Sequence, residues 1–189
     1  MKYKRPLKIT SRTSSVTNGF VQAILPDALP DREEHGAILA MLEQNPNRLT
    51  CVYCGDPAQH WDHLNPYVKG KRPSGYLNEA RNLVPACGPC NTSKSGHDWR
   101  AWMFGNAKGS PATRGIPNLN TLAARIDNMV ALSELKPIDL RTMIDPELWN
   151  RYWSRLEEIE ALLIAAQREA AEIQEQIAAC VRHSSGAEH

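Results

Sequence analysis

Two pairs of cysteines, each with two residues between its members, frame the most informative part of the chain. Cys51 and Cys54 form the first pair, and Cys87 and Cys90 form the second. A CxxC pair closes a tight turn that points two sulfurs at one ion. Two such turns predict a closed tetrahedral zinc site, which we expect to be structural because four thiolates leave no open coordination position. Two redox-active dithiols are the alternative.

A second group of residues, placed between and just after these turns, suits hydrolytic chemistry. Asp62 offers a hard carboxylate oxygen to a divalent cation, and Asn91 offers a neutral amide oxygen to the same ion. His63 has an ordinary pKa near neutrality, which suits it to accept a proton from water. Neighbouring residues on a strand point to opposite sides, so His63 can face the water while Asp62 faces the ion. Together these groups meet the needs of phosphodiester hydrolysis.

The order of these residues resembles the HNH nuclease motif of the ββα-metal fold. The matching pattern is CxxCG, DHxxP, a glycine-containing loop and NLVPxCxxCNxxKxG, over roughly residues 51–104. The resemblance implies a DNA endonuclease that leaves 5′-phosphate and 3′-hydroxyl ends. It implies that Asp62 and Asn91 hold one Mg²⁺ or Mn²⁺ and that His63 is the general base. Asn82 matches the middle asparagine, which we expect to hydrogen-bond across the hairpin loop and orient His63.

The match to this family has one departure. Many HNH enzymes carry a second histidine at the position that Asn91 occupies in this chain. The nearest histidine, His97, lies six residues later, which corresponds to about 600° of helix rotation and places it off the face of Asn91. We therefore expect His97 to be a surface or phosphate-contacting residue and not a metal ligand.

Basic residues are concentrated in two segments. Residues 1–30 have a net charge of +4, and residues 51–110 carry seven basic against four acidic residues. Such segments suit a polyanion, here double-stranded DNA, although an ordinary solvated surface has the same appearance. The N-terminal positions are Lys2, Lys4, Arg5, Lys8 and Arg12, and the residues expected to contact DNA phosphates are Lys69, Lys71, Arg72, Arg81 and Lys94.

The pattern along the chain predicts an α+β protein. We expect a ββα-metal core with its four-cysteine zinc site, surrounded by helices and followed by a long C-terminal helix. The predicted ranges are 1–50, a basic arm and a helix at 31–45 capped by Asp31; 51–104, the nuclease core; 105–145, a linker at 105–118 and a helix at 119–135; and 146–189, the long helix. The expected core side of the helix at 119–135 comprises Leu122, Ile126, Met129, Val130 and Leu132.

The long helix starts at Pro146, with Asp145 as its N-cap. Its apolar positions then alternate in steps of three and four residues: Trp149, Tyr152, Leu156, Ile159, Leu163, Ala166, Ala170, Ile173, Ile177 and Cys180. This spacing predicts a heptad seam and favours a homodimer, which would place two active sites for the two strands of a palindrome. Packing on the chain's own helices, for instance 119–135, is the alternative.

These features limit the possible functions. No apolar run approaches the length of a membrane span, and no apolar segment follows the basic N-terminus, so we expect a cytoplasmic protein. The sequence also resembles small bacterial restriction-type HNH enzymes, which implies a site-specific endonuclease of type II. A phage or mobile-element nicking enzyme is an alternative. A non-catalytic, zinc-stabilised DNA-binding module is another, although the intact Asp62, His63 and Asn91 argue against it.

Overall fold

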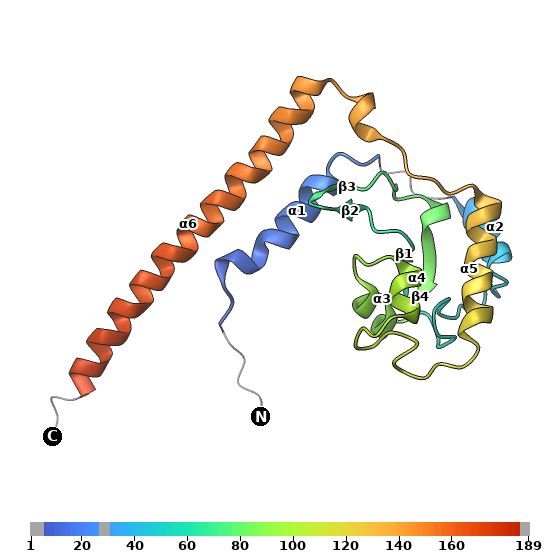
Figure 1. Cartoon of the computed structure of the whole chain (residues 1–189), viewed down its shortest axis with the longest axis horizontal. Coiled ribbons are helices and arrows are strands. Elements are labelled where there is room, and N and C mark those ends of the chain that lie inside the picture. Colours follow the sequence, from blue (N-terminus) through green and yellow to red (C-terminus); the bar gives the residue numbers. More distant parts are fainter. Residues whose placement is uncertain (1–5, 27–30, 186–189) are drawn as a thin grey trace. The chain divides into compact units, whose positions relative to one another are not determined.

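The computed structural model describes residues 6–26 and 31–185, and the chain divides into two compact units (Figure 1). One unit comprises residues 23–140, and the other joins the N-terminal 22 residues to residues 141–189. The predicted ranges differ from this division, since the structure separates the N-terminal helix from residues 31–50 and places residues 105–140 with the zinc-binding segment. Lys2, Lys4 and Arg5 of the predicted basic arm lie outside the described residues.

The first unit is built on a small antiparallel sheet. Strand β1 (His60–His63) pairs with β4 (Leu83–Ala86), so that Asp62 lies opposite Val84 and His63 opposite Leu83. Between them, β2 (Val68–Lys69) and β3 (Arg72–Pro73) form a short hairpin, and the 3-10 helix η2 (Ala80–Asn82) leads into β4. Helix α3 (Gly88–Lys94) follows β4 and packs against β1. This is the predicted α+β core of two strands and a helix.

Three further helices surround this sheet: α2 (Arg32–Met41), α4 (Trp99–Phe104) and α5 (Leu119–Ser133) (Figure 1). The capping box that begins α2 confirms Asp31 as its N-cap, because the Asp31 side chain accepts from the Glu34 amide. One apolar position of α5 was wrongly predicted. Leu132 is 58% exposed, and Ser133 faces the core in its place, because at 100° per residue the seventh position after Ile126 lies within about 20° of it, whereas the sixth lies about 120° away.

Residues 105–118, predicted as a linker, form a packed loop without regular secondary structure. Ser110 is completely buried, and its hydroxyl group donates to the carbonyl of Gly105. The hydroxyl group of Ser93 in α3 donates to the carbonyl of Lys108. Hydrogen bonds therefore attach this segment to the helix that follows the second cysteine pair.

The second unit is a helical hairpin. It contains η1 (Ile9–Arg12), α1 (Thr13–Gln22) and the long helix α6 (Pro146–Ser185), with η3 (Leu140–Met143) just before α6. The Asp145 carboxylate accepts from the Leu148 amide, which confirms the predicted N-cap. Helix α1 lies along α6 (Figure 1), where the Tyr152 hydroxyl group donates to the carbonyl of Phe20, and Val21, Trp153 and Leu156 are buried. The first part of the predicted seam thus packs inside the chain.

A second apolar face of α6 remains exposed. At 100° per residue, its members fall within about 60° of one another around the helix axis. They are Leu148, Ile159, Leu162, Ile173 and Ile177, with exposed fractions between 36% and 69%. The far end of the predicted seam, at Cys180, is exposed as well. Over residues 6–26 and 31–185, no helix is both long enough and apolar enough to cross a membrane.

Candidate metal centre and active site

The four predicted cysteines form one buried cluster. The sulfurs of Cys51, Cys54, Cys87 and Cys90 all lie within 4.8 Å of one another, and those of Cys54 and Cys87 are 3.6 Å apart. A tetrahedral zinc ion with Zn–S bonds of about 2.3 Å requires sulfur–sulfur distances of about 3.8 Å. The spacing and the donor chemistry therefore fit Zn²⁺, and the closed set of four thiolates fits a structural site.

Proton sharing within the cluster explains why an ion is needed there. Hydrogen bonds from Cys54 and then Cys90 lower the pKa of Cys51 to about 4. Hydrogen bonding with Cys51 and Cys54 raises the pKa of Cys90. Without a metal, one thiolate thus forms easily while the last thiol resists ionisation. A bound dication removes that resistance, and its binding releases protons.

An arginine from the packed loop lies over this cluster. Arg114 donates from one guanidinium nitrogen to the Cys90 sulfur at 3.2 Å and from another to the Asp56 carboxylate at 3.0 Å. Its positive charge offsets the negative charge that four thiolates bring to one divalent ion. The segment predicted as a linker therefore takes part in the metal centre.

The carboxylate of Asp62 lies inside the unit, with only 7% of its side chain exposed. Its Oδ2 atom accepts a hydrogen bond of 2.8 Å from the Tyr53 hydroxyl group and lies 3.1 Å from the Lys94 ammonium group. Burial and the Asp62 carboxylate raise the pKa of Tyr53 well above 10, so the hydroxyl group stays protonated and donates. Asp62 is therefore held by two donors.

The predicted role of Lys94 was wrong. It was expected to contact a DNA phosphate, but its side chain is completely buried. Its ammonium group pairs with Asp62 and donates to the carbonyl of His63 at 2.7 Å. Desolvation by burial lowers the pKa of Lys94. A buried charge with these partners cannot reach a phosphate at the surface.

His63 lies beside Asp62 at the end of β1, half-buried. Its Nε2 atom is 3.1 Å from the side-chain oxygen of Asn78, and its ring meets the Tyr67 ring edge-on at 4.9 Å between centroids. Desolvation by burial lowers the pKa of His63 below 6.5. The imidazole is therefore neutral at physiological pH and, with Nε2–H donated to Asn78, keeps the lone pair of Nδ1 available to accept a proton.

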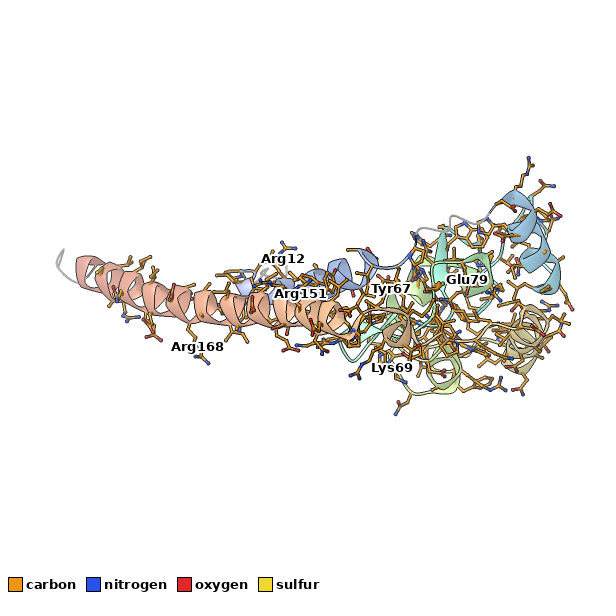
Figure 2. All side chains as sticks on the ribbon, turned by 90° about the horizontal axis from the view of Figure 1, so that it is seen from above. Arg12, Tyr67, Lys69, Glu79, Arg151 and Arg168 are labelled. Atoms are coloured by element: carbon orange, nitrogen blue, oxygen red, sulfur yellow. The ribbon has the colours of Figure 1, made fainter. Side chains whose placement is uncertain are left out.

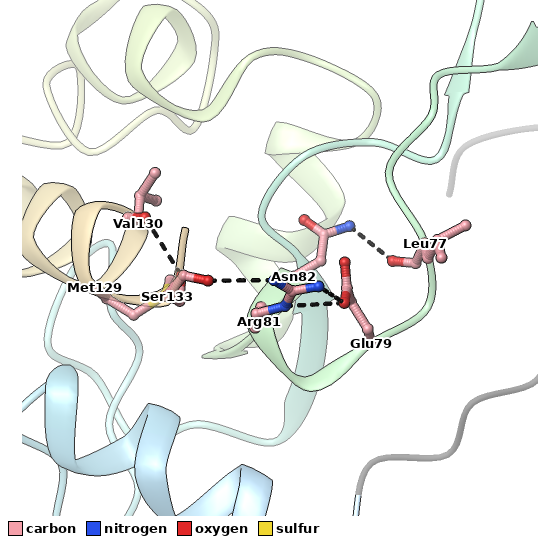
Figure 3. Close-up of polar contacts among 7 residues, drawn as sticks. All are labelled: Leu77, Glu79, Arg81, Asn82, Met129, Val130 and Ser133. Carbon is pink, nitrogen blue, oxygen red and sulfur yellow. Dashed lines mark hydrogen bonds and ion pairs between the residues drawn. The ribbon is translucent and has the colours of Figure 1, made fainter. Parts of the chain in front are cut away.

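Asn82 is completely buried and bridges the loop that joins the two strands. Its side-chain oxygen accepts from the Asn65 amide, and its side-chain nitrogen donates to the carbonyl of Asn65. The same nitrogen donates to the carbonyl of Leu77 (Figure 3). It thus makes the hydrogen bonds expected across the loop. The partner of the His63 ring, however, is Asn78.

Asn91 occupies the first turn of α3, directly after Cys90, and is partly exposed. It precedes Lys94 by three residues and so lies on nearly the same side of the helix. Because Lys94 contacts both Asp62 and His63, that side of α3 is the one that faces the end of β1. His97 is exposed beyond the end of α3, as expected of a surface residue.

The remaining predicted DNA-contacting residues differ in their surroundings. Lys69 and Lys71 are exposed on the β2–β3 hairpin, where Figure 2 labels Lys69, and Arg72 is partly buried beside them. Arg81 has structural partners, since its guanidinium group pairs with Glu79 and donates to the carbonyl of Ser133 on α5 (Figure 3). The hairpin is thus a better candidate for DNA contact than Arg81.

Tyr53 and Asn78 were not selected from the sequence. Tyr53 lies between the first two cysteines, where any residue type fits a turn, and only the fold brings it to Asp62, nine residues away. Asn78 lies four residues before Asn82 in a polar stretch that reads as a loop. The sequence shows Asn78 only as an asparagine fifteen residues after His63, and this spacing does not predict that the two side chains meet.

The comparisons with known proteins agree with this geometry. The model of the HNH endonuclease family matches residues 51–96, the segment from the first cysteine pair to just past α3. No curated protein and no solved structure shows a significant match. The matched segment carries all four clustered cysteines and the Asp62–His63 pair. Residues 51–96 of this chain are therefore an HNH endonuclease domain of the zinc-containing variant.

Proposed function

We propose that this protein is a metal-dependent DNA endonuclease, with His63 as general base and with Asp62 and Asn91 as ligands of one Mg²⁺ or Mn²⁺. The observation that carries the proposal is the placement of His63 beside Asp62 at the end of β1. Its ring is oriented by Asn78, and burial lowers its pKa, which favours the neutral form that a proton acceptor requires.

The residues divide the hydrolysis of a phosphodiester between them. His63 takes a proton from the attacking water, and Asn78 keeps the ring oriented while it does so. As the water oxygen bonds to phosphorus, the P–O3′ bond breaks and the leaving oxygen takes a proton from solvent. Asp62 and Asn91 would hold a hard divalent ion, which would neutralise charge at the phosphoryl group and the leaving oxygen. Asn82 and the zinc cluster hold the loop and the helix on which these residues lie.

A cleavage assay tests the proposal. Supercoiled plasmid is incubated with the wild-type protein, His63→Ala, Asp62→Ala and His97→Ala in Mg²⁺ or Mn²⁺. We expect His63→Ala to lose at least about 100-fold in rate, the usual contribution of a general base. His97→Ala is the matched control and should cut at the wild-type rate. Equal cutting by wild type and His63→Ala would refute the role of His63. DNA binding without cutting by the wild type would favour a non-catalytic module.

We further propose a site-specific, type II restriction-like enzyme acting on double-stranded DNA. The matched domain is small, so sequence reading falls to the exposed Lys69 and Lys71 of its β2–β3 hairpin and to the segments that flank residues 51–96. Sequencing the ends after digestion of a complex DNA tests this specificity. Ends that share one sequence, with 5′-phosphates, are the expected result, and scattered ends would refute it.

We propose that two chains associate through the exposed apolar face of α6 defined above. This face runs from Leu148 to Ile177, about 44 Å at 1.5 Å per residue, and its members are exposed although α1 contacts the neighbouring Tyr152 of α6. A two-fold dimer would supply one active site for each DNA strand. Arg151 lies about 60° from Leu148 around the helix axis and so borders this face, whereas Arg168 projects from nearly the opposite side of α6 (Figure 2).

Light scattering on the intact protein tests the association. Wild type should have twice the mass of one chain, and Leu162→Glu should be monomeric, because a charge in an apolar interface is costly. Glu175→Lys is a control on the opposite side of the helix and should leave the mass unchanged. A monomeric wild type that nicks one strand would favour the phage or mobile-element type of enzyme.

A further inference from the structure

The candidate metal ligand Asp62 is held by donors that come from both zinc-binding turns. Tyr53 lies inside the first cysteine pair, and its hydroxyl group donates to Oδ2 of Asp62 at 2.8 Å. Lys94 lies on α3, four residues after Cys90, and its ammonium group is 3.1 Å from the same oxygen. The two halves of the zinc site thus converge on one carboxylate oxygen.

The other carboxylate oxygen of Asp62, Oδ1, has different surroundings from Oδ2. No described group donates a hydrogen bond to Oδ1, and Oδ1 is not one of the buried side-chain atoms that lack a partner. The small exposure of the Asp62 side chain therefore includes this atom. A carboxylate with Oδ2 saturated by two donors and Oδ1 open is suited to bind an ion through one oxygen only.

Lys94 also fixes the main chain at the candidate base. Its ammonium group donates to the carbonyl of His63 at 2.7 Å, and this residue and Asp62 are the last two of β1. Both Tyr53 and Lys94 are almost entirely shielded from solvent, so water does not compete for these bonds. One side chain of α3 thereby sets the place of the Asp62 carboxylate and of the His63 backbone.

We propose that Tyr53 and Lys94 are positioning residues that hold Oδ2 of Asp62 and present Oδ1 to the divalent ion, which makes the zinc turns part of the ion's binding geometry. This inference rests on the proposed function for its catalytic meaning. Hydrogen-bond partners of metal ligands set the orientation of the ligand and its basicity, and their loss costs 10- to 100-fold in metal affinity or activity.

Binding of Mn²⁺ to the zinc-loaded protein tests the proposal without any cleavage. Calorimetry or electron paramagnetic resonance would compare wild type with Tyr53→Phe, Lys94→Met and Asp62→Ala. We expect Tyr53→Phe, which removes one oxygen atom, to weaken Mn²⁺ binding about tenfold. Lys94→Met should weaken it at least as much, and Asp62→Ala should abolish it. Tyr76→Phe and Lys108→Met are matched controls and should bind Mn²⁺ as the wild type does.

Three results would overturn the proposal. Wild-type affinity in both Tyr53→Phe and Lys94→Met would show that neither residue positions Asp62. Tighter binding in Lys94→Met would show that the ammonium group competes with the ion. Binding by Asp62→Ala equal to the wild type would remove Asp62 as a ligand. Because the loss of a buried charge in Lys94→Met can prevent folding, zinc content and near-ultraviolet circular dichroism are measured first, and Tyr53→Phe decides the matter if that variant is unfolded.

Cleavage kinetics separate this inference from the proposed function. In an active enzyme, Tyr53→Phe should raise the Mg²⁺ concentration needed for half-maximal rate about tenfold. Its affinity for DNA without a divalent ion should stay unchanged. If the wild type cuts no nucleic acid yet Tyr53→Phe still weakens Mn²⁺ binding, the nuclease proposal fails while the positioning role stands.

Discussion

The zinc-containing unit and the α1–α6 hairpin differ in which side chains they bury and which they expose. In residues 23–140, Asp62, Asn82 and Lys94 are buried polar groups, and each has hydrogen-bond or ionic partners. On α6, Leu162 and Ile177 are large apolar side chains that are more than half exposed. Buried polar groups are stable only with partners, whereas an exposed apolar stripe gains free energy by association. The buried, partnered polar groups are typical of a functional site, and the exposed apolar stripe is typical of an association surface.

The zinc cluster should distinguish the two units most strongly. Changing Cys87 and Cys90 together to serine removes two ligands from an ion whose binding contributes roughly 10–16 kcal/mol in small zinc domains. That is comparable to the whole stability of a domain, about 5–15 kcal/mol, so residues 23–140 should unfold. The α1–α6 hairpin has none of these ligands and should keep its helical circular dichroism. Zinc content and circular dichroism are the measurements.

The exposed Cys180 supplies the control for this experiment. Cys180→Ser should retain the zinc content and the circular dichroism spectrum of the wild type. Full zinc content in the double variant would contradict the four-cysteine site, and loss of all helical signal would contradict the independence of the hairpin.

Two leucines of α6 sharpen the comparison within one helix. Leu156 is completely buried, while Leu162 is 69% exposed. Leu156→Ala should cost about 2–5 kcal/mol of unfolding free energy, because it leaves a cavity between α6 and α1. Leu162→Ala should change it by no more than about 0.5 kcal/mol in dilute protein. Urea denaturation at several protein concentrations measures both, and a large, concentration-dependent cost for Leu162→Ala would indicate an interface at Leu162.

A glycine in each unit allows the effect of an added Cβ atom on stability to be compared between the two units. Gly75 has φ +93°, and a Cβ atom there would lie 2.4 Å from the carbonyl oxygen of Ile138. Gly75→Ala should therefore destabilise the zinc-containing unit by about 1–3 kcal/mol. Gly19, inside α1, has open space around it, and Gly19→Ala should stabilise the hairpin by about 0.5–1 kcal/mol. Thermal denaturation checks both signs; a neutral Gly75→Ala would mean that the two segments separate easily.

The pH dependence of cleavage gives the smallest expected effect. Burial lowers the pKa of His63, so the neutral base persists below pH 6.5 and the rate should fall only at lower pH, by up to tenfold per unit. The hydrogen bond with Asn78 raises that pKa, and Asn78→Ala should therefore move the fall to still lower pH. Rate profiles of the two proteins test this; a midpoint at or above 6.5 in the wild type would contradict a buried neutral base.

Local patterns predicted many elements correctly. Asp31 and Asp145 cap their helices as expected, because a cap requires only a side chain within three residues of the amide that it accepts from. The four cysteines cluster because their spacing in each turn already aims two sulfurs at one point. Leu132 was wrongly predicted, because the helical period counted from Ile126 places it about 120° off the buried face of α5.

The amino-acid sequence by itself determined the four cysteines that are placed to hold a metal ion, the adjacency of Asp62 and His63 and the helical pattern of α6, because these depend on residue type and short-range spacing. Only the tertiary structure decided that Lys94 holds Asp62, that Asn78 orients His63 and that Leu156 and Leu162 have different surroundings. A lysine has the same chemistry in water and in a core. Its role follows from the burial and the partners that residues distant in the chain provide.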